Sequence, residues 1–185
     1  MSSTVVHEAL TLFLLTQSRV TNIPIFLILR LQLNVFASME LTSVETIVTS
    51  LLIQYLTFFA FGGSNAISSV DLSNAYNGID NYNVVLVGIL TYVGNWAGPI
   101  WWTSAVLLLN AGRARNETLA RMALLTFHVA SMLISVMAAC TALRTHLFIW
   151  TVFSPKYLYT MAWVVIHHLA VNLLGEANIL FPRVT

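Results

Sequence analysis

Hydrophobic residues along the chain gather into long blocks that short polar stretches separate. A helix that crosses a bilayer needs about 20 apolar residues. Four blocks reach about that length: 39–61, 84–109, 118–142 and 156–174. Pro155-Lys156 separates the last block from a shorter apolar stretch just before it, which we expect to dip into the membrane. The pattern predicts four transmembrane helices.

The first 38 residues carry a weaker pattern. Residues 5–15 are apolar but too short to cross a membrane, and Arg30 and Asn34 lie four positions apart within 23–36, on one helical face. We therefore expect one or two amphipathic, interfacial or partly embedded helices over 1–38. Residues 39–185 would form the bundle of a single all-α, polytopic membrane domain. Glu8 stands where a signal peptide carries positive charge, so a cleaved signal is not expected.

Composition agrees with this pattern. Hydrophobic residues make up 58% of the 185 residues, charged residues 8%, and the mean hydropathy is +0.81. A soluble domain usually has about a quarter charged residues, so the chain is predicted to be an integral membrane protein. The net charge of +1 argues against a nucleic-acid partner. The single Cys140 excludes an internal disulfide, and its apolar surroundings predict a small buried core residue.

The polar segment 62–83 is the exception to this composition. Gly62-Gly63 is typical of a helix C-terminus, and Asp71-Leu72-Ser73-Asn74 could cap a short helix on the membrane. The segment is either a hydrogen-bonded connector, which composition favours, or a surface that contacts a sugar or phosphate headgroup. For the second interpretation the candidate contact residues are Ser64, Asn65, Asp71 and Asn74.

The stretch Gly94–Pro99 lies in the middle of a predicted span. Gly94 and Gly98 form a GxxxG pattern that allows close helix packing, and Pro99 disfavours helical geometry at Gly98. Asn95 needs a partner away from lipid. We expect a broken helix inside the bundle, and whether Asn95 lines a lipid pocket or only packs stays open. Trp101 and Trp102, which follow, are interpreted as packing residues.

Other candidate residues are weaker. Lys156 could meet a phosphate near the membrane surface, or extend to the headgroups without a specific partner. His128, His167 and His168 are interpreted as hydrogen-bonded packing residues, because adjacent histidines point about 100° apart on a helix. No catalytic residue and no metal site are expected in this chain, since no zinc spacing or phosphate-binding loop is found.

Arginine and lysine positions suggest an orientation. With segment 62–83 on the non-cytosolic side, six basic residues fall on the cytosolic side: Arg19, Arg30, Arg113, Arg115, Arg121 and Arg183. Arg144 and Lys156 fall opposite. This bias favours a segment 62–83 that faces a lumen.

Several stretches resemble the C-terminal membrane region of the fungal GPI ethanolamine phosphate transferases of type 2. They are FFAFGGSNAISSVDLSNAYNG, GNWAGPIWWTSA and HLFIWTVFSPKYLY, with TNIPIFLILRLQ and LTSVETIVTSLLIQY upstream. The resemblance runs from about Thr21 to about Leu174. It implies an endoplasmic reticulum membrane enzyme that moves phosphoethanolamine from phosphatidylethanolamine to a mannose of the GPI precursor, in this member the second mannose.

The resemblance also implies a division of labour. Catalysis in the family belongs to a luminal domain with two zinc ions, which this chain lacks, so no zinc cofactor is expected here. The chain would anchor the enzyme, position both lipids and dock a small stabilising membrane subunit. An alternative is a stand-alone, non-catalytic scaffold that stabilises GPI-pathway subunits. A transporter ranks lower, because neither inverted repeats nor paired intramembrane charges are evident. Whether Met1 is the true start stays open.

Overall fold

A computed structural model describes residues 3–63, 70–109, 117–146 and 160–169 of the chain. Within these ranges the chain is helical with connecting turns and forms no strand, which confirms the all-α prediction for this part. The elements are α1 (Ser3–Gln17), the 3-10 helix η1 (Val20–Asn22), α2 (Ile23–Ser38), α3 (Ser43–Ala60), α4 (Val84–Asn95), α5 (Ala97–Leu109) and α6 (Glu117–Ala142). A further helical segment covers 160–169.

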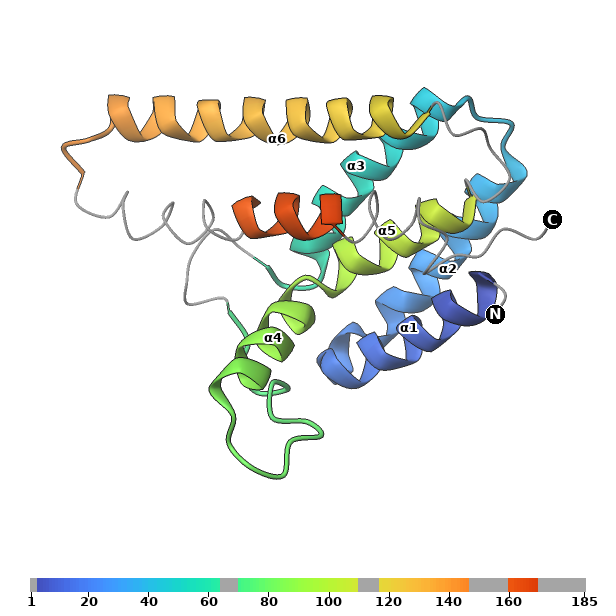
Figure 1. Ribbon diagram of the computed structural model, residues 1–185, viewed down its shortest axis with the longest axis vertical. Coiled ribbons are helices and arrows are strands. Elements are labelled where there is room, and N and C mark those ends of the chain that lie inside the picture. Colours follow the sequence, from blue (N-terminus) through green and yellow to red (C-terminus); the bar gives the residue numbers. More distant parts are fainter. Residues whose placement is uncertain (1–2, 64–69, 110–116, 147–159, 170–185) are drawn as a thin grey trace.

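Helix α5 lies at the centre of the fold. It packs against α3 on one side and α1 on another, while α6 lies across the end of α3 at the top of Figure 1. The core around α5 contains Leu14 of α1, Leu29 of α2, and Trp101 and Trp102 of α5. Both indoles are 1% exposed, which confirms that they are packing residues.

Two helical segments are long and apolar enough to cross a membrane. These are Val20–Ser38, which joins η1 to α2, and Ala123–Ala142 within α6. The bent pair α4 and α5 makes a third if it is counted as one span. The predicted spans 118–142 and 84–109 thus correspond to α6 and to this pair. The membrane character is supported, while the count of four is not reached among the described residues.

The other two predicted spans differ from the prediction. The apolar part of α3, Val44–Ala60, is shorter than the block 39–61. A Thr42–Glu45 capping box starts this helix, so the residues before it are not helical. Of the block 156–174, the structure describes residues 160–169, which are helical. Conversely, Val20–Ser38 is long and apolar enough to cross a membrane although it contains Arg30. The interfacial placement of 1–38 stays a prediction.

Helix α3 ends as its two glycines predict. Gly62 has φ +90°, and the N–H groups of Gly62 and Gly63 donate to the carbonyl oxygens of Phe59 and Phe58 at 3.0 and 3.1 Å. This pair of bonds is a Schellman motif, which satisfies carbonyls that a helix end leaves without partners. The short helix expected after Asp71 does not form. Residues 73–78 make successive turns instead.

The predicted break within Gly94–Pro99 is confirmed, but the expected loss of helical geometry at Gly98 was wrong. The two helices meet at 72° around Trp96, and Gly98 lies inside the first turn of α5. The first α5 hydrogen bond runs from Ile100 N–H to the Trp96 carbonyl at 3.0 Å. Pro99 lies in the first turn of α5, before that bond, where the backbone N–H groups have no helical partner and a missing N–H costs nothing. The proline therefore follows the break, and Gly98 is helical.

Candidate functional site

Asp71 and Asn95 join the polar segment to the helix break. The Asp71 N–H donates to Asn95 Oδ1 at 2.9 Å, and Asn95 Nδ2 donates to the Asp71 carbonyl at 3.0 Å. Nδ2 also donates to the Thr91 carbonyl one turn back, at 2.8 Å. The oxygen and both N–H groups of this amide are therefore used. Asn95 therefore holds the backbone of the polar segment at Asp71. These bonds are the partners that a polar side chain within an apolar span requires.

The Asp71 carboxylate holds a second set of contacts. Arg19 Nε donates to Oδ2 at 2.6 Å, and Ser73 donates to Oδ1 from its N–H at 3.0 Å and its hydroxyl at 2.6 Å. Partial burial works against ionisation, but the hydrogen bonds from Ser73 and Arg19 outweigh it and lower the pKa of Asp71 to about 2. Asp71 is therefore a carboxylate at physiological pH.

The ion pair corrects the predicted placement of Arg19. Arg19 was placed on the side opposite segment 62–83, yet it contacts Asp71 of that segment at 2.6 Å. Two further bonds tie the same regions together: Asn77 Nδ2 donates to the Thr16 carbonyl at 2.9 Å, and Asn22 Nδ2 to the Phe61 carbonyl at 3.0 Å. The α1–η1 junction and the polar segment lie on one side, so the bias of basic residues is weaker than the sequence suggested.

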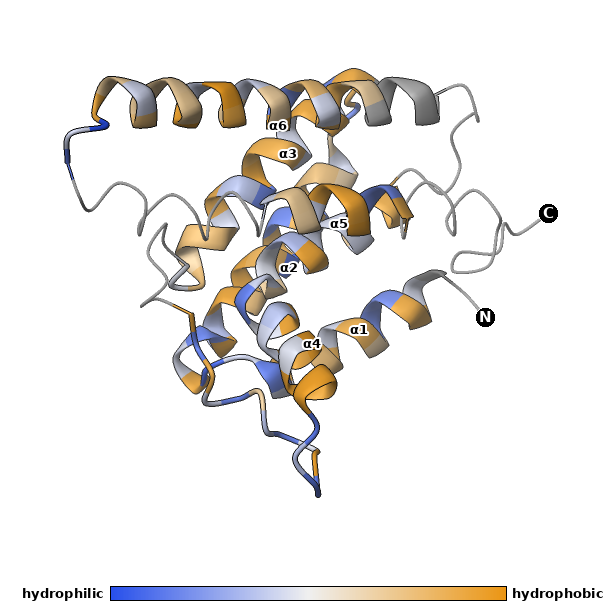
Figure 2. Cartoon of the chain, turned by 60° about the vertical axis from the view of Figure 1, so that its left-hand side comes forward, coloured by the Kyte–Doolittle hydropathy of each residue, from blue (hydrophilic) through white to orange (hydrophobic). Residues whose placement is uncertain are grey.

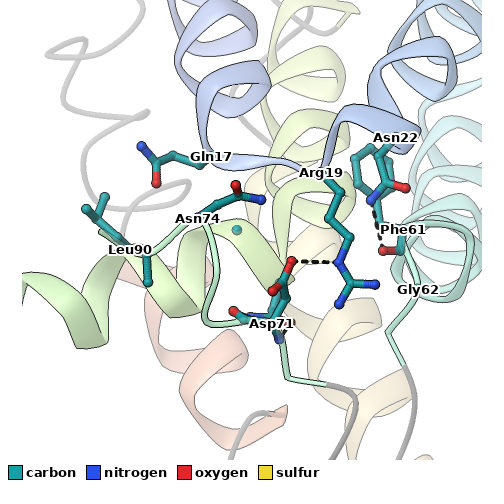
Figure 3. A pocket seen from close by; sticks show the side chains of 11 residues that line it. Gln17, Arg19, Asn22, Phe61, Gly62, Asp71, Asn74 and Leu90 are labelled. Atoms are coloured by element: carbon teal, nitrogen blue, oxygen red, sulfur yellow. Dashed lines mark hydrogen bonds and ion pairs between the residues drawn. The ribbon is translucent and has the colours of Figure 1, made fainter. Parts of the chain in front are cut away.

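A small open cavity lies between these elements (Figure 3). Its lining includes Gln17, Arg19, Asp71, Asn74, Gly94 and Asn95, and its volume is about 20 Å³. That is room for one water-sized group. Gln17 is 5% exposed, and its Oε1 has no hydrogen-bond partner among the described residues. The cavity therefore lies beside the Arg19–Asp71 ion pair.

The two glycines of the GxxxG pattern contact different neighbours. A Cβ at Gly94 would lie 2.8 Å from the Gln17 carbonyl oxygen, and one at Gly98 would lie 2.8 Å from Thr57 Cβ. Gly94 thus lets the end of α1 approach the cavity, and Gly98 lets α3 approach α5. Pro99 is also fully buried. Close contacts between helices are therefore visible at both glycines.

The predicted contact residues divide into two groups. Asp71, Asn74 and Asn95 come from separate stretches of sequence and line the same cavity. Ser64, Asn65 and Lys156 lie outside the described residues, and nothing about their contacts follows. Figure 2 shows hydrophilic residues along 70–83 at the bottom of the molecule, in contrast with the apolar helices.

A second polar cluster was missed by the sequence analysis. His7 is fully buried, and its Nδ1 lies 2.8 Å from Ser104 Oγ. That hydroxyl donates its single proton to the Trp101 carbonyl at 2.7 Å, so it accepts from His7 Nδ1–H. Trp101 Nε1 in turn donates to Thr11 Oγ1 at 2.9 Å. His7 and Thr11 at i and i+4 were the available signal in an otherwise apolar stretch.

The other histidines and the cysteine show no metal chemistry. His168 Nε2 lies 3.1 Å from Thr126 Oγ1, and the His167 ring lies 5.4 Å from that of Trp163, as expected for packing residues. In the part of the chain that the structure describes, no three His, Cys, Asp or Glu side chains gather to hold a metal ion. Cys140 is partly exposed, so its predicted full burial was wrong.

Comparison with known proteins identifies the family. The family model described as "GPI ethanolamine phosphate transferase membrane region" matches residues 1–183. Relatives named GPI ethanolamine phosphate transferase 2 include that of Aspergillus oryzae, 65% identical over 95% of this chain and 21% of the relative. Those of Aspergillus fumigatus and Yarrowia lipolytica are 61% and 39% identical, over 88% and 91% of this chain and 21% and 24% of the relatives.

The chain spans about a fifth of the length of the curated relatives it matches. No solved structure matches it. The match includes the motifs that carried the resemblance at the level of sequence. The chain belongs to the family of GPI ethanolamine phosphate transferase membrane regions.

Proposed function

We propose that this chain is the membrane module of an ethanolamine phosphate transferase of GPI-anchor biosynthesis. It anchors the enzyme and positions the lipid substrates, while phosphoryl transfer takes place on a zinc-dependent domain outside this chain. The observation that carries the proposal is the match of residues 1–183 to a membrane region of this family. The apolar helices α2, α4, α5 and α6 agree with an anchoring role.

The proposed substrates are phosphatidylethanolamine as donor and the second mannose of the GPI precursor as acceptor. The names of the relatives, GPI ethanolamine phosphate transferase 2, support ethanolamine phosphate as the transferred group and GPI as the acceptor. The donor lipid and the second mannose are proposed from the resemblance alone. The proposed site of action is the endoplasmic reticulum membrane, with 62–83 in the lumen. A small membrane subunit is proposed to dock on the helices and stabilise the module.

A four-span topology is part of the same proposal. Helix α3 has 18 residues, which at 1.5 Å each is about 27 Å, close to the hydrocarbon thickness of about 30 Å. The helical segment 160–169 belongs to the predicted last span. Labelling of single cysteines introduced at Asp80 and at Thr145, on a Cys140→Ala background, would report which side of the membrane each occupies.

A chimera tests the function directly. Residues 1–183 would replace the corresponding segment of the Aspergillus oryzae enzyme in cells that lack their own transferase. We expect phosphoethanolamine to return to the GPI precursor, and fragmentation by mass spectrometry to place it on the second mannose. The 185-residue chain expressed alone should restore nothing.

Two outcomes would overturn the proposal. One is a chimera that reaches the membrane at normal levels and transfers no phosphoethanolamine. The other is transfer by the isolated chain, which would place catalysis within these residues. In the active chimera, Ala at Ser64, Asn65, Asp71 and Asn74 together tests whether segment 62–83 contacts the headgroups. Unchanged transfer and expression would reduce the segment to a connector.

A further inference from the structure

An ion pair joins α1 to α2 on a surface that is otherwise largely apolar. Arg30 Nη1 of α2 contacts Glu8 Oε1 of α1, and the two side chains are 46% and 50% exposed. The pair was not evident from the sequence, because its members come from different helices. About half of each charged side chain is therefore open to a further neighbour.

Arg30 lies near the middle of a segment that is long and apolar enough to cross the membrane. It is the eleventh of the 19 residues of Val20–Ser38, about 12–15 Å from either end at 1.5 Å per residue. A hydrocarbon core about 30 Å thick places the middle of such a segment near the centre of the bilayer. Charged side chains at that depth are rare and almost always face the interior of a helix bundle. A half-exposed ion pair there requires a neighbour other than lipid.

The residues around the pair suit a helix as that neighbour. Leu27 of α2 and Leu12 of α1 lie within about one turn of Arg30 and Glu8, and they are 68% and 66% exposed. Asn34, one turn after Arg30 on the same face, is exposed as well. The surface thus combines apolar residues with an amide and two charges. Polar side chains of this kind hydrogen-bond across helices inside a membrane.

The charges define the chemistry of the neighbour, and the length of the relatives indicates its source. Because Glu8 and Arg30 neutralise each other, the neighbour needs no net charge. An acceptor facing Arg30 and a donor facing Glu8 suffice, and one Asn or Gln amide supplies both. The chain matches a membrane region but spans only 21% of the Aspergillus oryzae relative, so most of that enzyme lies outside it.

We propose that the surface formed by Glu8, Leu12, Leu27, Arg30 and Asn34 docks a transmembrane helix of the same enzyme. That helix lies outside this chain and carries an amide or hydroxyl side chain at mid-membrane depth. The inference rests on the proposed function, in which this chain is the membrane module of a longer transferase. It assigns the face through which the module joins the rest of the enzyme.

The first test identifies the neighbour by crosslinking in the full-length chimera. Photoreactive benzoyl-phenylalanine would replace Leu27, and mass spectrometry would identify the crosslinked peptide. The matched control is the same replacement at Ile134 of α6, which is 66% exposed and has no charged side chain within four residues of it. We expect Leu27 to crosslink to a peptide of the enzyme outside residues 1–183, and Ile134 to crosslink to lipid.

A charge exchange tests the role of the pair. Glu8→Arg combined with Arg30→Glu keeps an ion pair between α1 and α2 but reverses its polarity toward the neighbour. The thermal unfolding midpoint of the isolated chain should stay unchanged. In the chimera, the yield of the Leu27 crosslink should fall at least about twofold, because the interhelical hydrogen bonds are lost.

Three results would overturn the proposal: a Leu27 crosslink to lipid alone, one to a second copy of residues 1–183, or one to a different protein. A charge exchange that leaves the crosslink unchanged would also overturn it, since the pair would then only hold α1 against α2. The comparison of Leu27 with Ile134 decides the question even if the exchanged variant does not fold. A chimera that transfers phosphoethanolamine while Leu27 crosslinks only lipid would reject this surface and leave the proposed function standing.

Discussion

Helices α5 and α6 are both strongly apolar, yet they occupy different surroundings. Eight residues of α5 are buried against the rest of the protein, including Trp101, Trp102 and Ser104. The apolar stretch of α6 is only 11% buried, and it meets α3 mainly through Leu125 and Val129. Hydropathy alone does not distinguish the two helices.

The difference shows what holds such a fold together. In a membrane an apolar side chain gains little by moving from lipid to a neighbouring helix, so close packing and hydrogen bonds determine the contacts. Helix α5 has both, since Gly98 allows α3 to approach and Ser104 bonds to His7. Helix α6 instead presents large exposed residues, such as Phe127, which is 73% exposed.

The largest effect is expected from truncating an α5 indole. Trp101→Ala should destabilise the chain by about 3–5 kcal/mol, because it opens a cavity and removes the bond to Thr11. Phe127→Ala on α6 should change stability by less than about 0.5 kcal/mol. Reversible unfolding in mixed micelles measures both. Similar losses at the two positions would show that α6 is as tightly packed as α5.

A smaller loss is expected where α5 meets α3. Gly98→Ala puts a Cβ 2.8 Å from Thr57 Cβ and should cost about 2–3 kcal/mol, the upper range for overpacking. Gly88→Ala in α4 is the control, since nothing lies within 4 Å of its added Cβ. That change should be neutral or stabilise by up to about 1 kcal/mol. An unchanged free energy of unfolding in Gly98→Ala would mean that α3 and α5 can move apart without loss of stability.

The buried hydroxyl of α5 ranks next. Ser104→Ala leaves His7 Nδ1–H without an acceptor and should cost about 1–2 kcal/mol. Ser131→Ala on α6 removes only a local bond to the His128 carbonyl at an exposed position, so its effect should stay within about 0.5 kcal/mol. The same unfolding assay compares them. Equal effects would show that the His7–Ser104 hydrogen bond does not contribute to holding α1 against α5.

The smallest effect concerns pH and the polar segment. The folded-state pKa of Asp71 is lowered from 3.8 to about 2, so its stabilising contribution is present above pH 3.8 and is lost as the pH falls through about 2. Wild type should therefore lose stability over this window relative to Asp71→Asn, which cannot titrate. Parallel pH profiles of the two proteins would contradict the hydrogen bonds that Ser73 and Arg19 donate to the Asp71 carboxylate.

About half of the candidate site could be read from the sequence. Asp71, Asn74 and Asn95 stand out because each is polar beside apolar blocks, and the structure brings them to one cavity. Gln17 and Arg19 do not stand out, since a polar pair between two apolar stretches is ordinary for a loop. Their role depends on where α1 ends relative to α4, and periodicity carries no information on that distance.

The sequence by itself determined the class of the protein, its helices and the features that arise within a few residues. The Schellman end at Gly62-Gly63 and the interruption within Gly94–Pro99 both follow from local backbone chemistry. Only the tertiary structure decided which apolar helices are buried, that Arg19 and Asp71 share one side, and that His7 is a core residue. Those outcomes depend on contacts between segments far apart in the chain. The hydropathy of a helix does not predict them, because an apolar side chain is equally compatible with a protein neighbour and with lipid.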